Sequence, residues 1–291
     1  MPTLLDFRRR IRSVKNSQQI TRAMKFVAAA RLRKAQEAAL AARPYAQELA
    51  RVLRSTMERI EEPRHRLLAK RLEERVLVIV ISGERGLAGP FNTNLLRKAN
   101  ELILSMKGKK ISILPVGKKG RDAMRRAGYE FVGEYVNVLA RVDYGVAKEI
   151  ANLVAQLYME DKIDAVYMAF SEFKSVVAAN VTVQKLLPIE QIEGLAKKDE
   201  KEPEQKIDYI YEQPVEQILG RLLPRYVETQ ILRAMLESSA AEYAARMTAM
   251  EAATKNAGEV IEALTLHMNK VRQAAITKEI IEIVSGASST E

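Results

Sequence analysis

Two glycine-rich segments contain the residues whose types could bind phosphate. SGERGLAGPFN begins at Ser82, directly after the apolar run VLVIVI, and GKKG occupies residues 117–120. Glycine-rich turns after a strand can bring backbone N–H groups close to a phosphate. Neither segment fits a phosphate-binding motif: Ala88 stands where G-x-x-x-x-G-K-[ST] needs its second glycine, and Glu84 stands where G-x-G-x-x-G needs its first. We therefore expect a structural turn, or a loop that contacts a partner, in place of a nucleotide site.

Other catalytic chemistry has few candidates in this chain. Cysteine is absent, which excludes disulfides, thiolate nucleophiles and cysteine metal sites and fits a reducing compartment. The two histidines, His65 and His267, are far apart in sequence, which argues against a zinc site or a histidine-based triad. No pair of carboxylates stands out for acid–base work. An independent enzyme is therefore the weaker hypothesis, and we expect no catalytic residue, cofactor or metal.

The charge of the chain points to an acidic partner. The formal net charge is +10, and no Asp or Glu occurs between Phe7 and Gln36, where ten basic residues stand. A solvated helix face is the alternative, but such faces usually mix charges of both signs. Nucleic acid is disfavoured because only Phe7 and Phe26 provide aromatic rings within the basic run and no nucleic-acid-binding motif is present. The ten residues are Arg8, Arg9, Arg10, Arg12, Lys15, Arg22, Lys25, Arg31, Arg33 and Lys34.

The middle of the chain alternates strands and helices. The β-branched run at 76–81 predicts a strand buried on both faces, and further strands are expected at 111–116 and 165–170. Helices are expected at 92–106, 118–127 and 143–159. This alternation predicts a parallel, Rossmann-like α/β sheet. The charged segment 194–207 reads as a linker, and residues 208–211 as one short strand.

Two long helical segments flank this α/β part. The first covers residues 3–60, where Pro44 should kink the helix, and the second begins at Arg225 and continues to residue 285. About 60 helical residues would form a rod of ~90 Å, longer than a compact chain of this size. Each apolar stripe is too narrow for a normal domain, so we expect the two helices to pair as an antiparallel coiled coil. The second stripe is rich in small residues at 234, 241, 245, 249, 252, 253 and 257.

The predicted fold class is thus α/β, with a long antiparallel coiled coil of the N- and C-terminal helices and a Rossmann-like domain. The expected division is an N-terminal helix at 1–62, the α/β domain at 75–193, the linker at 194–207 and the C-terminal helix at 208–291. No signal peptide and no apolar run long enough to span a membrane are seen, so a membrane link would go through a partner.

Three segments together resemble the γ subunit of the rotary F-type ATP synthase, of the bacterial type. They are IRSVKNSQQITRAMKFVAAARLRKAQ near the N-terminus, the loop SGERGLAGPFN, and the C-terminal LPRYVETQILRAMLESSAAEYAARMTAMEAATKNA with RQAAITKEIIEIVSGA. The loop departs from the common SDRGLCGGFN of this family at Glu84 and Pro90, which leaves its shape open. The cysteine-bearing insertion of chloroplast relatives is missing, which argues against thiol regulation.

The resemblance implies a rotor shaft without catalytic activity. Its expected partners are the α and β subunits of an α3β3 ring, the ε subunit and the membrane c-ring, and its expected place is the cytoplasmic face of the bacterial plasma membrane, as a peripheral subunit. Proton flow through the c-ring would turn the shaft, and catalysis would occur on β. The resemblance also implies contacts with partner subunits for Met24, Lys25, Ala88, Arg246, Gln273 and Thr277, although seam packing is an equal alternative for Met24.

Overall fold

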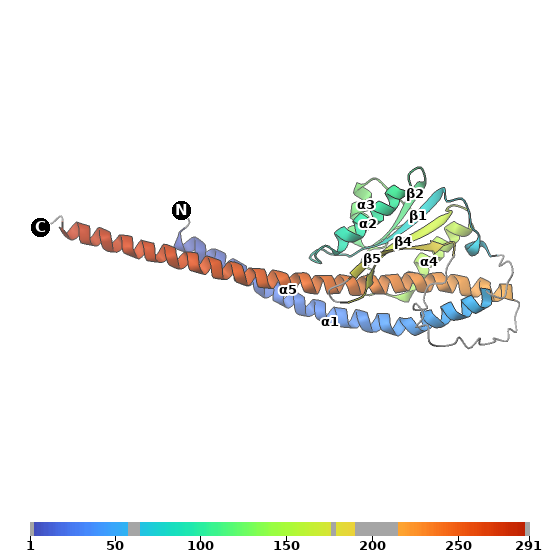
Figure 1. Ribbon diagram of the computed structural model, residues 1–291, viewed down its shortest axis with the longest axis horizontal. Coiled ribbons are helices and arrows are strands. Elements are labelled where there is room, and N and C mark those ends of the chain that lie inside the picture. Colours follow the sequence, from blue (N-terminus) through green and yellow to red (C-terminus); the bar gives the residue numbers. More distant parts are fainter. Residues whose placement is uncertain (1–2, 58–64, 176–178, 190–214, 289–291) are drawn as a thin grey trace, which may run out of the picture. The chain divides into compact units, whose positions relative to one another are not determined.

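The chain forms two compact units. The computed structural model describes residues 3–57, 65–175, 179–189 and 215–288 (Figure 1). One unit comprises Met1–Ala29 with Arg246–Glu291, and the other comprises Ala30–Ala245. Helices α1 (Leu4–Met57) and α5 (Val215–Ser288) each contribute to both units. The linker expected at 194–207 and the short strand expected at 208–211 lie outside the described residues.

The unit Ala30–Ala245 contains a five-stranded sheet in the order β3-β2-β1-β4-β5. The strands are β1 (Arg75–Ile81), β2 (Lys110–Val116), β3 (Glu130–Phe131), β4 (Ala165–Phe173) and β5 (Ala179–Leu187). The first four are parallel, as the sequence predicts for a Rossmann-like sheet. Strand β5 was not predicted from the sequence, and it runs antiparallel to β4. Only residues 174–178 separate the two strands, too few for the crossover that a parallel pair requires.

Helices cover both faces of this sheet. Alternate side chains of β1 point to opposite faces and belong to two different apolar clusters. Val76, Val78 and Val80 pack with residues of α2 (Phe91–Ser105) and α3 (Lys118–Arg126). The intervening residues of β1, Leu77, Ile79 and Ile81, pack with α4 (Tyr144–Met159) and α5. The prediction that the β-branched run forms a strand buried on both faces is therefore confirmed.

Helix α5 begins at Val215, ten residues earlier than the sequence predicts, and Pro224 lies inside it. A proline within a helix leaves the carbonyl four residues earlier without its N–H donor and crowds it. Here that residue is Gly220, which is exposed, so water can reach its carbonyl. Pro44 lies within α1 in the same way, four residues after the exposed Leu40. The prolines are thus accommodated where the affected carbonyl belongs to a solvent-facing residue.

Within the unit Ala30–Ala245, α5 is a core helix. Every residue from Tyr226 to Ala244 is buried except Leu232 and Arg233, which are half-buried. The expectation that this helix buries only a narrow stripe is wrong here, because the sheet face and α4 surround it. Ala234 and Ala241, assigned from sequence to a coiled-coil seam, pack instead in clusters of this globular part.

The unit formed by Met1–Ala29 and Arg246–Glu291 is the predicted antiparallel coiled coil. Contacts join Lys25 to Glu251, Thr21 to Thr254 and Phe7 to His267. Residue numbers therefore fall along α1 as they rise along α5, which means that the two helices are antiparallel. Most of the less exposed positions follow alternating spacings of three and four, the heptad pattern of coiled coils. They are 4, 7, 11, 14, 18, 21, 25 and 28 on α1, and 250, 254, 257, 261, 264, 268, 271 and 275 on α5.

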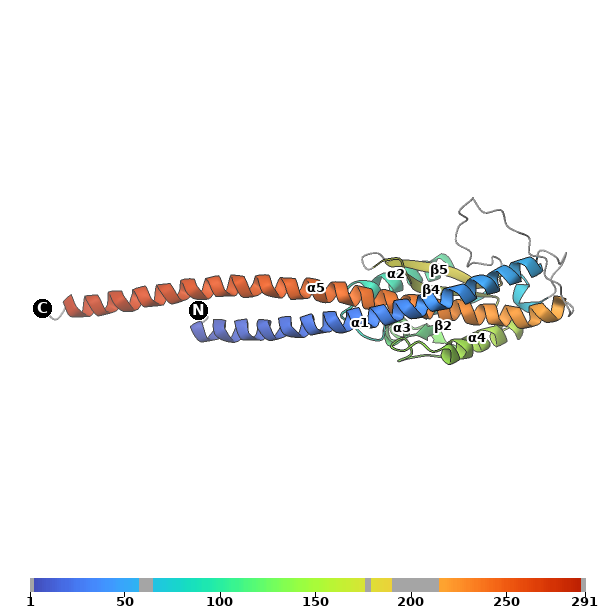
Figure 2. The ribbon, with the colours of Figure 1, turned by 90° about the horizontal axis from the view of Figure 1, so that it is seen from below.

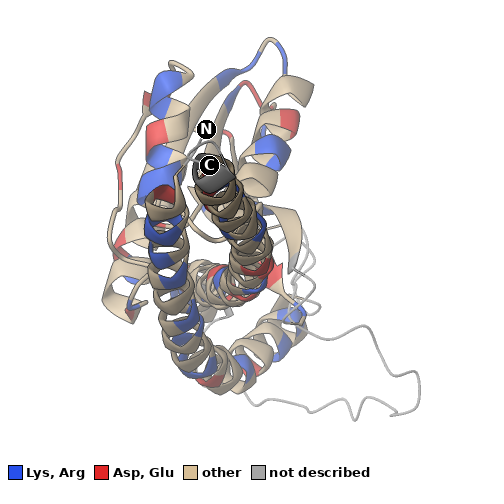
Figure 3. Ribbon diagram, turned by 90° about the vertical axis from the view of Figure 1, so that its left-hand side faces the viewer, with Lys and Arg blue, Asp and Glu red and all other residues tan. Residues whose placement is uncertain are grey.

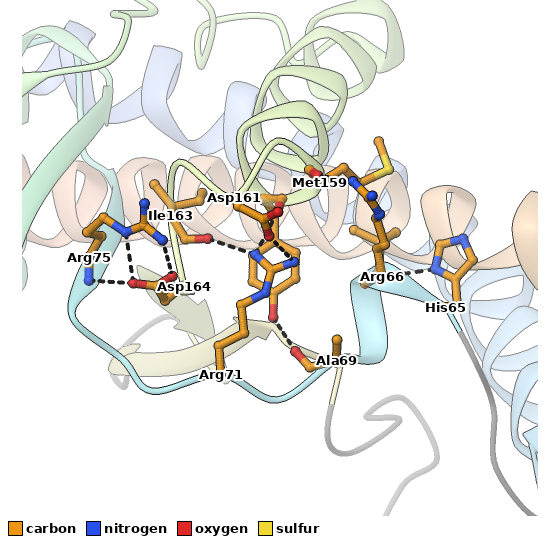
Figure 4. A network of polar contacts seen from close by, with 11 residues as sticks. His65, Arg66, Ala69, Arg71, Arg75, Met159, Asp161, Ile163 and Asp164 are labelled. Carbon is orange, nitrogen blue, oxygen red and sulfur yellow. Dashed lines mark hydrogen bonds and ion pairs between the residues drawn. The ribbon is translucent and has the colours of Figure 1, made fainter.

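A polar network anchors the chain where it enters β1 (Figure 4). The Arg71 guanidinium lies 4.5 Å from the Tyr158 ring centroid and 2.6 Å from the Asp161 carboxylate. The Tyr158 hydroxyl donates to the Ala69 carbonyl at 2.7 Å, and Arg75 pairs with the buried Asp164 at 2.6 Å. Segment 65–75 is thereby tied to the end of α4 and the start of β4, which fixes the strand that leads to the glycine-rich loop.

Candidate functional site

The two glycine-rich segments meet at the carboxyl end of β1, where the chain satisfies its own N–H groups. At the start of α3, the Gly120 N–H donates to Ser82 Oγ at 2.6 Å and the Lys119 N–H to the Gly83 carbonyl at 3.0 Å. The Lys118 N–H donates to Glu84 Oε2 at 3.0 Å. These are the groups that a helix N-terminus would offer to a phosphate. Because residues 82–84 bind all three, this helix start is closed.

The glycines of GKKG serve close packing against Ser82. Gly117 has φ 108°, and a Cβ there would lie 2.0 Å from the Ser82 carbonyl oxygen. A Cβ at Gly120 would lie 2.7 Å from Ser82 Oγ. The two glycines at the start of α3 are therefore explained by the close approach of their backbone to a single serine.

The loop 84–90 is held at both ends and presents its middle to solvent. Glu84 Oε1 accepts a second bond, from the Val138 N–H at 3.1 Å, and Asn92 Oδ1 accepts from the Gly83 N–H at 2.9 Å. Leu87 is 63 % exposed at φ 64°, a left-handed conformation uncommon for leucine. Ala88 is only 1 % exposed and packs with Phe91 and Ala241. The loop shape that the sequence left open is thus held by Glu84 and Asn92, and its exposed residues are 85–87, 89 and 90.

The other residues that the resemblance singled out lie on the two long helices. Met24 and Lys25 are half-buried in the coiled coil, and Lys25 Nζ lies 2.5 Å from Glu251 Oε1. Arg246 is half-buried and is the first α5 residue that belongs to the coiled-coil unit. Gln273 and Thr277 are exposed, and the Thr277 hydroxyl donates to the Gln273 carbonyl at 2.9 Å. The structure brings Met24 and Lys25 together on α1 and Gln273 and Thr277 together on α5, while Ala88 belongs to the separate globular unit.

A polar layer interrupts the seam of the coiled coil, and the sequence reading missed it. Thr21 Oγ1 and Thr254 Oγ1 are 2.8 Å apart, and Gln18 Nε2 donates to the Thr254 carbonyl at 3.3 Å. A Cβ at Gly258 would lie 3.2 Å from Gln18 Nε2, so the glycine leaves room for this side chain. Polar residues at seam positions specify register in coiled coils. The detectable signal was that Gln18 and Thr21 fall on the three-and-four spacing.

The coiled coil carries an unbalanced positive charge on α1 (Figure 3). Arg8, Arg9, Arg10, Arg12 and Lys15 are all exposed. Within the described residues, Lys25 of this α1 segment forms an ion pair with Glu251 of α5. An exposed basic face of this kind favours a negatively charged surface as its partner.

The C-terminal end of α5 has no α1 residue opposite it. Phe7 lies against His267, with ring centroids 5.0 Å apart, and α1 begins at Leu4, so α5 continues well beyond its partner (Figures 1 and 2). This end is nevertheless rich in exposed β-branched residues, which are Ile276, Ile280, Ile281, Ile283 and Val284. A single helix with large apolar side chains in water is marginal unless another surface covers them. The end of α5 is therefore a candidate partner-binding element.

Comparison with known proteins gives the family of this chain. The sequence model of the ATP synthase family matches residues 3–290. The ATP synthase gamma chain of Solibacter usitatus (strain Ellin6076) is 48 % identical over 300 residues and covers 100 % of both chains. That of Desulfitobacterium hafniense (strain DSM 10664 / DCB-2) is 47 % identical over 291 residues, again covering 100 % of both. The chain belongs to the ATP synthase gamma-chain family.

Solved structures show the same fold. A chain in the Euglena gracilis mitochondrial ATP synthase, OSCP/F1/c-ring, rotational state 3, matches with a TM-score of 0.69 and 21 % identity, covering 99 % of this chain and 94 % of that one. A chain in the Tetrahymena thermophila mitochondrial ATP synthase, central stalk/c-ring, matches with a TM-score of 0.60 and 24 % identity, covering 80 % and 99 %. The predicted combination of α/β domain and antiparallel coiled coil is confirmed by the structure and by these likenesses.

Proposed function

We propose that this chain is the central rotor shaft of a bacterial ATP synthase and has no catalytic site of its own. The observation that carries the proposal is the unpaired, apolar end of α5, which needs a surrounding protein surface. In the proposed assembly this surface is the inside of the α3β3 ring. The likeness to chains of central-stalk and rotor structures, together with the gamma-chain relatives, supports the same assignment.

A shaft of two helices can couple rotation to catalysis because it is asymmetric. One asymmetric rod cannot make identical contacts with three identical sites, so each catalytic site has a different contact free energy with it. Only such differences in interaction free energy can bias the conformations of the three sites. Turning the shaft then takes each β site through every conformation, and proton flow through the c-ring drives the turning.

The proposed contacts on the two long helices are those that the family resemblance implies. On the coiled coil they are Met24, Lys25, Arg246, Gln273 and Thr277, beside the basic face of α1. In the loop 84–90 we propose that Arg85 and Leu87 meet the partner and that Ala88 supports them from within. The α/β domain at 75–193 and the ε subunit would sit on the c-ring. Among the described residues, no helix is long and apolar enough to cross a membrane. Attachment at the cytoplasmic face would therefore go through the partners.

Co-expression with α and β subunits tests this function. We expect a stable complex that hydrolyses ATP, while the purified chain alone hydrolyses none. Replacing Ile280 and Ile283 by Asp should leave the melting temperature of the isolated chain unchanged and reduce recovery of the complex at least fivefold. The matched control is Leu104→Asp, which alters an exposed leucine on α2. ATP turnover by the isolated chain, or full recovery of the complex with both isoleucines changed, would contradict the proposal.

A further inference from the structure

Strand β4 continues past the end of its neighbour β1. The pairing of β1 with β4 ends at Val80 and Ala169, whereas β4 extends to Phe173. Ser171 and Phe173 are two residues apart, so their N–H groups point to the same side of the strand. On the opposite side, β4 continues its antiparallel pairing with β5. The two N–H groups therefore face the position where β1 is no longer present.

Helix α5 supplies the missing acceptors. The Ser171 N–H donates to Ser238 Oγ at 3.2 Å, and the Phe173 N–H donates to Glu237 Oε2 at 3.0 Å. The other oxygen of Glu237 lies 3.7 Å from the guanidinium of Arg43 on α1. Ser238 is completely buried and the Glu237 side chain is 7 % exposed. Two consecutive side chains of a helix thus replace a strand for the last part of β4.

This replacement occurs at a special place in the sheet. The chain builds β2 and β3 on one side of β1 and β4 on the other, so the strand order reverses between β1 and β4. The crevice at the carboxyl ends of such strands is where doubly wound sheets bind their ligands. Here α5 fills it: a Cβ at Gly83, just after β1, would lie 2.9 Å from the Glu242 side chain. The ligand position of this fold is occupied by the chain itself.

We infer that this filled crevice is the joint that transmits torque between the globular part and α5, with Glu237, Ser238 and Ser239 as its positioning residues. The inference rests on the proposed rotor function. The hydrophobic effect is non-directional, whereas hydrogen bonds hold their two groups at a defined angle, so they fix the rotational setting of the helix. Ser239 Oγ donates to the Leu139 carbonyl at 3.0 Å, so three consecutive residues hold three backbone groups. Successive residues are about 100° apart around a helix, so these ties span about 200° of its circumference.

The mechanical test uses the assembled, membrane-bound complex with Ser238→Ala and Ser239→Ala combined. We expect ATP hydrolysis in the absence of a proton gradient to stay within twofold of wild type. ATP-driven proton pumping against a gradient should fall at least fivefold, because the helix slips under load. The matched control is Thr229→Val, which removes a buried hydroxyl of α5 that donates at 2.7 Å to the Arg225 carbonyl of the same helix. This control should pump as wild type does.

A second measurement needs no activity. Amide hydrogen exchange in the isolated chain should be about three- to tenfold faster at Ser171 in Ser238→Ala, the range that one lost hydrogen bond predicts. Thr229→Val should leave it unchanged. The proposed joint would be contradicted by an unaltered exchange rate at Ser171 in Ser238→Ala. It would also be contradicted if the double variant pumped protons against a gradient as well as wild type does. A wild-type complex that does not pump at all would instead refute the proposed function.

Discussion

The Lys25 ammonium lies 2.5 Å from the Glu251 carboxylate and so joins α1 to α5 across the antiparallel coiled coil. This ion pair gives Lys25 a partner within its own chain, in addition to any acidic surface that the basic face of α1 meets. The two roles make different predictions for charge reversal.

Lys25→Glu should impair assembly or coupling of the complex, because it brings two carboxylates together and weakens attraction to an acidic partner. Both side chains are partly exposed, so the loss of stability in the isolated chain should be no more than ~1 kcal/mol. Adding Glu251→Lys restores the internal pair with reversed sign. If coupling recovers in this double variant, the internal pair is what matters. If it does not recover, Lys25 acts on a partner, and its effect should weaken at high salt.

Thr21→Cys combined with Thr254→Cys should form a disulfide on mild oxidation. The two hydroxyl oxygens are 2.8 Å apart, and the chain has no other cysteine to compete. Mobility on a non-reducing gel measures the product. Because both cysteines belong to the same shaft, the oxidised complex should retain ATP turnover, whereas a cross-link from shaft to ring should stop it. The single-cysteine variants are the controls, and failure to cross-link would mean that the register differs from the one described.

Leu87→Cys should react with a maleimide at least tenfold faster than Ala88→Cys in the isolated chain. Leu87 is 63 % exposed, whereas Ala88 is 1 % exposed and packs beneath the loop. Mass spectrometry of the labelled protein over time measures both rates. In the complex, labelling at position 87 should slow, because we propose that a partner covers this loop. Equal rates in the isolated chain would show that the loop opens and that Ala88 is accessible.

Gly117→Ala should destabilise the globular unit by about 3 kcal/mol or more, because a backbone clash adds to a positive φ. The new Cβ would lie 2.0 Å from the Ser82 carbonyl oxygen. Gly128→Ala is the matched control: its φ is 80°, but nothing lies within 4 Å of the added atom. It should cost only about 1–2 kcal/mol. Urea unfolding compares the two, and similar losses would mean that the approach to Ser82 relaxes easily.

The ion pairs of Glu73 should make the globular unit less stable in acid. Burial by itself would raise the pKa of Glu73, but hydrogen bonds from Lys109 and Lys185 outweigh it and lower the pKa to about 2. The two ammonium groups lie 2.8 and 2.9 Å from its carboxylate. Because the folded pKa is below the ordinary value of 4.5, the stabilisation is complete above about pH 4.5 and is lost as the pH falls towards 2.

Glu73→Gln should therefore lower the free energy of unfolding by about 2–3 kcal/mol at pH 7 and by much less at pH 2.5. Urea titrations at both pH values measure the difference. Glu101→Gln is the control, because Glu101 forms only exposed ion pairs on α2 and should change stability by less than ~1 kcal/mol. A destabilisation by Glu73→Gln that does not depend on pH would indicate lost packing in place of lost ion pairs.

Local patterns in the sequence were sufficient for most of the fold. The run at 76–81 has the composition of a strand buried on both faces, and that property is local. The heptad spacing of α1 and of the last part of α5 likewise required a partner helix, because a narrow apolar stripe is stable only when covered. The sequence showed that GKKG does not fit a phosphate-binding motif, since motif fit depends on residue identity alone, but only the structure shows that Gly117 caps α3 and that residues 118–120 form its first turn.

Other features depended on tertiary contacts. Where α5 begins could not be read from Pro224, because a proline inside a helix is tolerated only if its surroundings satisfy the freed carbonyl. Three such features join residues that are distant in sequence. Ala88 is buried against Ala241, Glu84 accepts a hydrogen bond from the start of α3, and Glu237 and Ser238 accept hydrogen bonds from the end of β4. Whether a side chain faces solvent, its own chain or a strand end is decided by which elements pack beside it. Helix α5 shows both cases: its periodicity specifies a coiled-coil stripe after Arg246, while before that residue the surrounding sheet and helices bury it on nearly every side.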